Sequence, residues 1–206
     1  MNEKPILFNS EMVNAILSGR KTMTRRIISE KTLHLFDVAA SAGECHPLEL
    51  CDQRSQSYYL EFCPLGKPGD QLWVRECFRV HSRATDVATL VYRASERNSW
   101  TEQTRRVPVS DCNRPVSPEK WAPSIHMPRW ASRINLLITG VRVERLNTIS
   151  TGDAMAEGYP AEREATGGPL DAWLWFRELW DGIYPDNTFE VNPWCWVIEF
   201  ERMEAK

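Results

Sequence analysis

The segment GRKTMTRR, residues 19–26, holds the densest group of cations and hydroxyls in the chain. Its charged and hydroxyl residues are Arg20, Lys21, Thr22, Thr24, Arg25 and Arg26. A threonine is a poor nucleophile, but a lysine whose pKa is lowered by desolvation or by neighbouring cations can take the proton of its hydroxyl. Lys21 and Thr24 could therefore carry nucleophilic catalysis. The same residue types also make a solvated edge strand, and residue types alone leave both interpretations open.

Catalysis by Lys21 and Thr24 sets a condition on the backbone. In a regular strand, residues three apart face opposite sides. Lys21 must therefore still belong to the turn made by Gly19, and not to the strand that follows it. We then expect the Lys21 amine and the Thr24 hydroxyl to lie within hydrogen-bond reach, directly or through one water, on the inside of a cleft.

Glu157 is a third ionisable candidate, at the end of a short helical pattern and directly before Gly158. The dipole at the C-terminus of a helix disfavours a negative charge. A carboxylate that takes up a proton readily there can shuttle protons. On spacing alone, a solvated residue of the last helical turn is the simpler interpretation.

Glu76 is a carboxylate inside an apolar strand pattern. Residues 71–80 alternate as one predicted strand, and Glu76 shares its apolar face with Leu72 and Phe78. An unpaired carboxylate is costly on such a face. We therefore expect Glu76 to pair with a nearby arginine or to line the cleft.

The segment WAPSIHMPRWASRI, residues 121–134, is predicted to be a structured loop, because its prolines prohibit a regular helix through the first part. His126 can act as an acid or base there, although a loop histidine between prolines more often packs and forms hydrogen bonds. The loop's candidates for stacking on a base or steadying phosphate are Trp121, Trp130, Arg129 and Arg133.

Helices and strands must position these segments. A short helix is predicted before GRKTMTRR, because Asn9 or Ser10 can cap it and Gly19 suits its left-handed exit. Further predicted elements are strands at residues 22–28, 89–94, 135–146 and 194–201, a helix over ISTGDAMAEGY capped by Ser150, and an amphipathic helix over LDAWLWFRELWDGIY. Strands mixed with a few helices and long, non-repeating connections predict an α+β fold in one domain.

Two stretches are predicted to be insertions, at about residues 30–63 and 82–120. The first is polar with scattered cysteines, and a hairpin with a strand at residues 58–62 is expected there.

The net charge of −3 and the pI near 5.9 exclude a surface that is basic all over, so a nucleic-acid site must be local. No apolar run is long enough to span a bilayer, and the first residues lack a basic segment followed by an apolar signal core. This predicts a cytoplasmic protein. The four residues Cys45, His46, Cys51 and Cys63 lack the paired spacings of zinc sites, so no metal is expected.

Several blocks of the chain closely resemble, in order, those of the ASCH family, particularly its longer members from phages and prophages. They are ILFNSEMVNAILSGRKTMTRR, GDQLWVRECF, PSIHMPRWASRI, VRVERLNTISTGDAMAEGY and NPWCWVIEF. The blocks cover well over half of the chain, including both ends. The combination of GRKTxTxR with PSIHMPRWASR is quite specific to the family, although neither motif fixes a reaction.

The resemblance implies a PUA-like mixed β-barrel with flanking short helices, related to modules that bind RNA or modified bases. The short enzymes of the family resemble N4-acetylcytidine amidohydrolases, which use a lysine and a threonine of GRKTxTxR and a glutamate on a later helix. These positions fall on Lys21, Thr24 and, in a looser alignment, Glu157. The chain departs from those enzymes in its length and in the loop PSIHMPRWASR, which could narrow or repurpose the cleft.

The resemblance therefore implies a protein that interacts with a nucleoside or RNA. Its most concrete form is a hydrolase of N4-acylated cytidine without metal or other cofactor, with Lys21, Thr24 and Glu157 as catalytic residues. A noncatalytic RNA-binding module and a ribonuclease are the alternatives. The expected partner is a modified nucleoside or single-stranded RNA, and a monomer is slightly favoured. The expected binding residues are Arg20, Arg25, Arg26, Glu76, Ser124, His126, Arg129, Trp130 and Arg133. The arginines among them are expected to converge around one opening.

Overall fold

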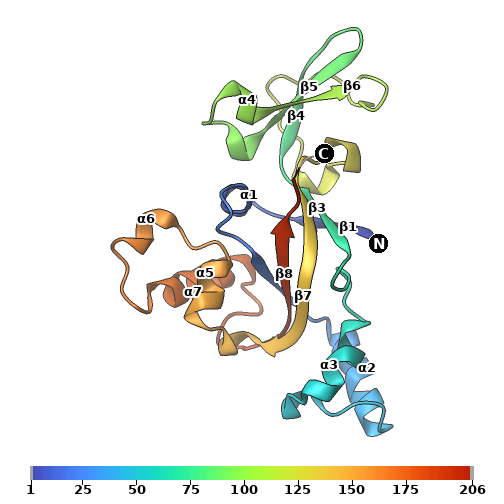
Figure 1. The fold of residues 1–206 in the computed structure, drawn as a ribbon, viewed down its shortest axis with the longest axis vertical. Helices are drawn as coiled ribbons and strands as arrows, with labels where there is room; N and C mark the ends of the chain where they lie inside the picture. The colour runs from blue at the N-terminus through green and yellow to red at the C-terminus, as the bar shows by residue number, and fades with distance from the viewer. Residues whose placement is uncertain (1, 205–206) are drawn as a thin grey trace. The chain divides into compact units, whose positions relative to one another are not determined.

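The computed structural model describes residues 2–204 as an α+β fold, which confirms the predicted class (Figure 1). The chain divides into two compact units, each built from segments that are distant in the sequence. The first unit comprises the residues up to Gly19, Gln71–Leu137 and the residues from Arg202, and the second comprises Arg20–Asp70 and Ile138–Glu201. A single domain with two insertions stays a prediction.

In the first unit, helix α1 (Ser10–Leu17) begins and ends as predicted. The Asn9 side chain accepts a hydrogen bond from the amide of Met12 at 2.8 Å, and Gly19 has a φ of +77°. Strand β1 (Glu3–Leu7) pairs in parallel with β3 (Gln71–Arg75). The first residues of β7 (Asn135–Arg145) pair antiparallel with β3.

A second sheet of the first unit has the strand order β4-β5-β6 and is antiparallel throughout. Its strands are β4 (Phe78–Arg83), β5 (Val87–Tyr92) and β6 (Thr104–Pro108), with the short helix α4 (Trp100–Gln103) before β6. The predicted single strand over residues 71–80 was therefore wrong. The chain leaves one sheet after Arg75 and enters the other at Phe78, and no glycine or proline marks the break.

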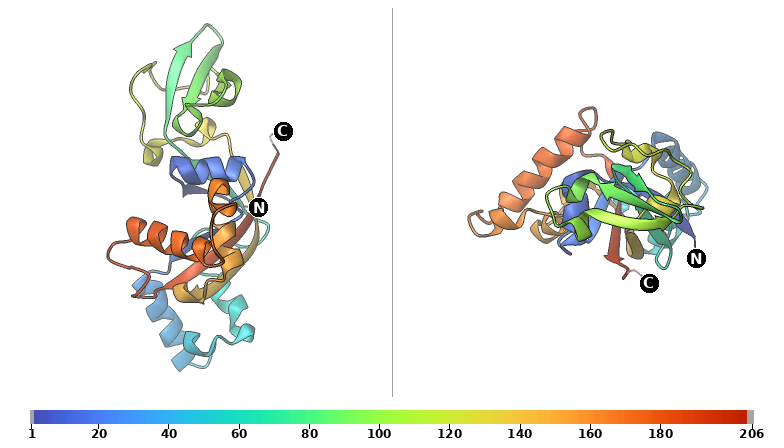
Figure 2. Two further views of the ribbon diagram at one scale, coloured as in Figure 1. Left: turned by 90° about the vertical axis from the view of Figure 1, so that its left-hand side faces the viewer. Right: turned by 90° about the horizontal axis from the view of Figure 1, so that it is seen from above.

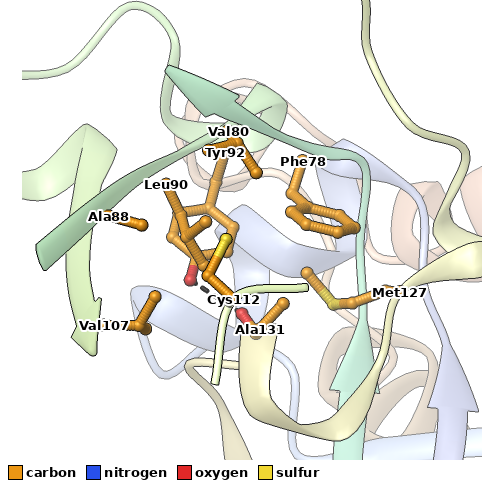
Figure 3. Close-up of a cluster of buried hydrophobic side chains, with 9 residues drawn as sticks. All are labelled: Phe78, Val80, Ala88, Leu90, Tyr92, Val107, Cys112, Met127 and Ala131. Carbon is orange, nitrogen blue, oxygen red and sulfur yellow. Dashed lines mark hydrogen bonds between the residues drawn. The ribbon is translucent and has the colours of Figure 1, made fainter. Parts of the chain in front are cut away.

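The core of this second sheet is a cluster of nine buried side chains (Figure 3). Phe78 and Met127 pack together in it, and the Tyr92 hydroxyl donates to the carbonyl of Ala131 at 2.7 Å. The predicted loop at residues 121–134 thus closes the core with two short 3₁₀ turns, Ser124–His126 and Arg129–Ala131. No regular helix forms there, as its prolines require.

In the second unit, strand β2 (Met23–Ile27) pairs antiparallel with β8 (Trp194–Arg202), with Met23 opposite Glu199. Strand β8 lies between β2 and β7. The helices α5 (Thr151–Ala156), α6 (Ala161–Glu164) and α7 (Asp171–Ile183) follow β7. The predicted cap of α5 is confirmed, because the Ser150 hydroxyl accepts from the amide of Asp153 at 3.0 Å.

Residues 30–64 were predicted wrongly as a hairpin with a strand at 58–62. They form helices α2 (Glu30–Ser41) and α3 (Gln56–Leu60), which lie side by side (Figures 1 and 2). The rings of Phe36 and Tyr59 pack with centroids 4.8 Å apart, so this segment buries aromatic surface of its own.

Among the residues described, none of the helices is both long and apolar enough to cross a membrane. The two strand orders do not close on themselves, so the predicted β-barrel is not seen within residues 2–204.

Candidate functional site: a buried ion network around Lys21 and Glu157

Lys21 and Glu157 are joined through both main chain and side chain. Lys21 lies before β2 and forms an isolated antiparallel bridge with Glu157, the residue that caps the C-terminus of α5. The Lys21 ammonium donates to the Glu157 carboxylate, to the Glu157 carbonyl and to the Met23 carbonyl, each at 2.8 Å. Lys21 is 2% exposed and Glu157 4%, so the ion pair is removed from solvent.

The environment of Lys21 acts on its charge in two directions. Burial lowers the pKa of the Lys21 ammonium, and the nearby Glu157 carboxylate opposes this shift. A lysine ammonium has three N–H donors, and three acceptors surround this one. The arrangement therefore suits the charged form of Lys21, although burial penalises that form.

Arg25 shares the Glu157 carboxylate with Lys21. Its side chain is 1% exposed, and its guanidinium lies 3.3 Å from Glu157, 2.6 Å from Asp153 and 3.5 Å from Glu144. Its Nε atom is buried without a hydrogen-bond partner among residues 2–204. Arg25 is thus held by three carboxylates, and its predicted role in binding RNA stays a prediction that would require those contacts to open.

Arg142 extends the network along β7 and was missed by the sequence analysis. Its guanidinium contacts Glu144 at 2.6 Å and Asp153 at 3.0 Å, and it also pairs with Glu199. Two signals could have indicated it. The first is that residues 142 and 144 alternate onto one face of a strand. The second is their charge, since an arginine and a glutamate on one strand face can pair.

The Thr24 hydroxyl forms a hydrogen bond with Arg26. It is buried and accepts a hydrogen bond from Arg26 Nη1 at 2.9 Å. Strand alternation places Thr24 and Arg26 on the face of β2 opposite to Arg25, whose guanidinium contacts Glu157. The predicted contact of Thr24 with Lys21, directly or through one water, stays a prediction.

Arg20 fixes the chain where α5 ends. Its guanidinium donates to the carbonyl of Tyr159 at 2.8 Å and to that of Gly158 at 3.3 Å. Gly158 has a φ of +108°, the left-handed conformation that favours glycine. The cation predicted to bind phosphate thus stabilises the turn that presents Glu157.

Glu76 pairs with an arginine, as predicted, within the first unit. Arg133 donates to both of its carboxylate oxygens, at 2.8 and 2.9 Å, and to the Ser95 hydroxyl at 2.9 Å. The guanidinium also lies over the Tyr92 ring, 4.1 Å from its centroid. Burial raises the pKa of the Glu76 carboxyl, and Arg133 opposes the shift. This fork holds the loop at residues 121–134 to the chain between β3 and β4.

The other predicted residues of the loop differ in exposure. His126 is exposed, Ser124 is half-buried, and Arg129 forms an exposed ion pair with Glu3 at 2.9 Å. Trp130 is half-buried and packs against the core cluster, with its ring nearly perpendicular to that of Phe78, and its predicted stacking on a base stays a prediction. The arginines at 20, 25 and 26 belong to the second unit and those at 129 and 133 to the first, and their convergence stays a prediction. Within residues 2–204, no three metal-ligating side chains of His, Cys, Asp or Glu gather as a metal site.

Comparison with known proteins gives one structural similarity. No protein-family model matches the chain, and no curated protein matches it. A search of solved structures finds the ASCH domain from Lactobacillus crispatus JV V101, with 12% sequence identity and a TM-score of 0.40 over 98% of this chain and 79% of that one. A TM-score of 0.40 is too low to transfer a fold or a function.

Proposed function

We propose that this chain recognises a nucleoside or an unpaired RNA nucleotide, and that Lys21 and Glu157 form the proton-transfer centre of a metal-independent hydrolysis of N4-acylated cytidine. The contact of 2.8 Å between the Lys21 ammonium and the Glu157 carboxylate carries this proposal. Buried groups with shifted pKa values cluster at functional sites, and burial lowers the pKa of Lys21. The resemblance of GRKTMTRR and DAMAEG to the ASCH blocks, with the PUA-like fold that it implies, supports the substrate class.

The two residues are suited to the reaction in one protonation state. As an ion pair, Lys21 holds its proton and cannot serve as a base, and Glu157 has none to give. Transfer of one proton from Lys21 to Glu157 yields an amine and a carboxylic acid, which are the base and the acid that amide hydrolysis needs. Burial lowers the pKa of Lys21 and so favours this transfer.

The proposed reaction then proceeds in two steps through an ester on Thr24. Thr24 Oγ1 attacks the acyl carbon while Lys21 takes the hydroxyl proton. The bond between the acyl carbon and N4 breaks, and Glu157 gives its proton to the leaving amine. Water then attacks this ester, which releases the acyl group as a carboxylic acid and restores the Thr24 hydroxyl. This sequence requires the Thr24 hydroxyl to reach Lys21, directly or through water, when substrate binds.

A noncatalytic nucleoside- or RNA-binding module is the second candidate, and one observation favours it. The Lys21 ammonium already donates to three acceptors, and the Thr24 hydroxyl accepts from Arg26. Groups satisfied in this way serve stability without any reaction. The ribonuclease alternative has no comparable support, since His126 is exposed in a turn.

One assay separates these candidates. The purified full chain is incubated with N4-acetylcytidine, and in parallel with single-stranded RNA, and cytidine release, RNA cleavage and RNA binding are measured. Release of cytidine that is lost in Thr24→Val and Lys21→Ala supports the hydrolase. Binding without turnover supports the module, and neither binding nor turnover overturns the proposal.

Matched controls come from exposed residues of the same types. Thr22→Val changes a hydroxyl two positions from Thr24, and Lys31→Ala removes an exposed lysine of α2. Both should keep the activity of the wild type. Circular dichroism and thermal melting of every variant show whether a loss of turnover is a loss of folding.

A further inference from the structure

A pocket lies in the first unit along the edge of β4 that does not pair with β5. The segment after β6 is tied to this strand at two points, where the amide of Ser117 donates to the Val80 carbonyl at 2.9 Å and that of Ala122 to the Phe78 carbonyl at 2.8 Å. Residues 118–121 bow out between the two ties. A cavity of about 380 Å³ is lined by residues of β4 and of this segment, within the range of small-ligand sites.

The charges around this cavity are of one sign. Arg79, Arg114 and Lys120 line it together with apolar residues, and no Asp or Glu is among the described residues of its lining. The chain as a whole has a net charge of −3. Three cations on apolar walls attract an anion, because the low-dielectric surroundings strengthen each interaction.

Aromatic rings hold the two arginines at the cavity. The guanidinium of Arg79 lies over the Trp121 ring, 4.9 Å from its centroid, and that of Arg114 lies over Phe78 at 5.4 Å. Arg114 also donates to the His126 carbonyl at 2.6 Å. Neither arginine has a carboxylate partner among residues 2–204, whereas Arg129 and Arg133 in the same unit do.

Arg79 has a further unsatisfied group. Its Nε atom is buried and has no hydrogen-bond partner among the described residues. A buried donor without a partner is costly, and most such donors in folded proteins have one. Arg79 is therefore less fully paired than Arg129 and Arg133 of the same unit.

We infer that this cavity binds an organic anion with a flat ring, of the size and charge of a nucleoside monophosphate. Its phosphate would lie among Arg79, Arg114 and Lys120, and its base would lie against the Trp121 side of the apolar wall. Guanidinium planes and aromatic rings both stack on bases. The same chemistry is offered by a free nucleotide and by a nucleotide unit of single-stranded RNA.

This inference goes beyond the proposed function, because the cavity shares no residue with the Lys21 and Glu157 site. Its test needs no turnover. Cytidine 5′-monophosphate, cytidine and inorganic phosphate are titrated separately into the full chain by calorimetry. We expect the monophosphate to bind, and cytidine and phosphate each to bind at least about tenfold more weakly, since each offers only one of the two interactions. A hexauridylate titration shows whether an RNA strand binds the same cavity.

Three variants locate the binding. Arg114→Gln, Lys120→Gln and Trp121→Leu should each weaken the monophosphate by about tenfold. Arg97→Gln, which changes an exposed arginine outside the lining, should bind it as the wild type does. Binding that is absent, or that is unchanged in all three lining variants, overturns the inference. The hydrolysis assay reports turnover at Lys21, Thr24 and Glu157, none of which lines the cavity, and the lining variants report binding. Failure of either proposal is therefore distinguishable from failure of the other.

Discussion

Lys21 and Glu157 are 136 positions apart in the chain, and they are paired by a backbone bridge and by an ammonium–carboxylate contact of 2.8 Å. The bridge ties the entry of β2 to the exit of α5. The Lys21 ammonium also donates to the Glu157 carbonyl, so one side chain satisfies a carbonyl that the end of the helix leaves open. The pair therefore joins local structure to the chemistry proposed for this site.

A double-mutant cycle tests how strongly the pair is coupled. Glu157→Gln should lower the free energy of unfolding by about 3–5 kcal/mol, because it leaves the buried Lys21 ammonium without its carboxylate. Lys21→Met should lower it by less, because Arg25 still pairs with Glu157. The double variant should lose about 2 kcal/mol less than the sum of the two losses. Urea unfolding followed by tryptophan fluorescence measures all four proteins.

Lys31→Met is the control for this cycle, because Lys31 is an exposed lysine of α2. It should change the free energy of unfolding by less than about 0.5 kcal/mol. Additive losses in the double variant would show that Lys21 and Glu157 stabilise the fold independently, in conflict with their direct contact.

The hydrogen bond from Arg26 to Thr24 makes Arg26 a positioning residue for the proposed nucleophile. Arg26→Gln should lower the kcat for N4-acetylcytidine about tenfold with little change in KM, because the bond of 2.9 Å orients the hydroxyl and not the substrate. Arg26→Lys should restore part of kcat. A change confined to KM would instead place Arg26 in substrate binding.

Local patterns predicted the elements that position the site. Asn9 and Ser150 cap their helices as expected, because capping depends on residues three apart. The burial of Arg25 could not be predicted in the same way. Its partners Asp153 and Glu157 come from the other end of the chain, and a cation within a strand pattern looks like a solvated edge.

The errors have physical causes too. Residues 30–64 mix polar and aromatic side chains without a clear period, and α2 and α3 are stabilised by the packing of Phe36 on Tyr59, a contact that sequence spacing does not show. The strand over residues 71–80 breaks at Glu76 because its two halves have different partners. The pairing of Glu76 was still predictable, since a carboxylate on an apolar face needs a cation.

The pH dependence of stability tests the burial of Glu76. Burial raises its pKa above the ordinary value of 4.5 in the folded state. The folded protein then holds a proton that the unfolded chain has lost, so the contribution of Glu76 is full below pH 4.5 and is lost as pH rises through the folded pKa. Relative to Glu76→Gln, the wild type should lose stability across this window, by at most about 1.4 kcal/mol per pH unit. Urea unfolding at a series of pH values measures the difference, and a gain with rising pH would mean that Arg133 outweighs burial.

Arg129 and Arg133 lie four positions apart in one loop and should respond differently to neutralisation. Arg133 is 13% exposed and pairs with a Glu76 side chain that is 2% exposed, whereas Arg129 and its partner Glu3 are 41% and 46% exposed. Arg133→Gln should lower the free energy of unfolding by about 3–5 kcal/mol, because the buried Glu76 carboxyl then loses the cation that pairs with it. Arg129→Gln should change it by less than about 1 kcal/mol.

If the loop meets RNA, Arg129→Gln should also weaken binding and flatten its salt dependence, because one fewer phosphate contact releases fewer counterions. Unchanged RNA affinity and salt slope in Arg129→Gln would make the loop a structural clamp, held by the fork between Arg133 and Glu76.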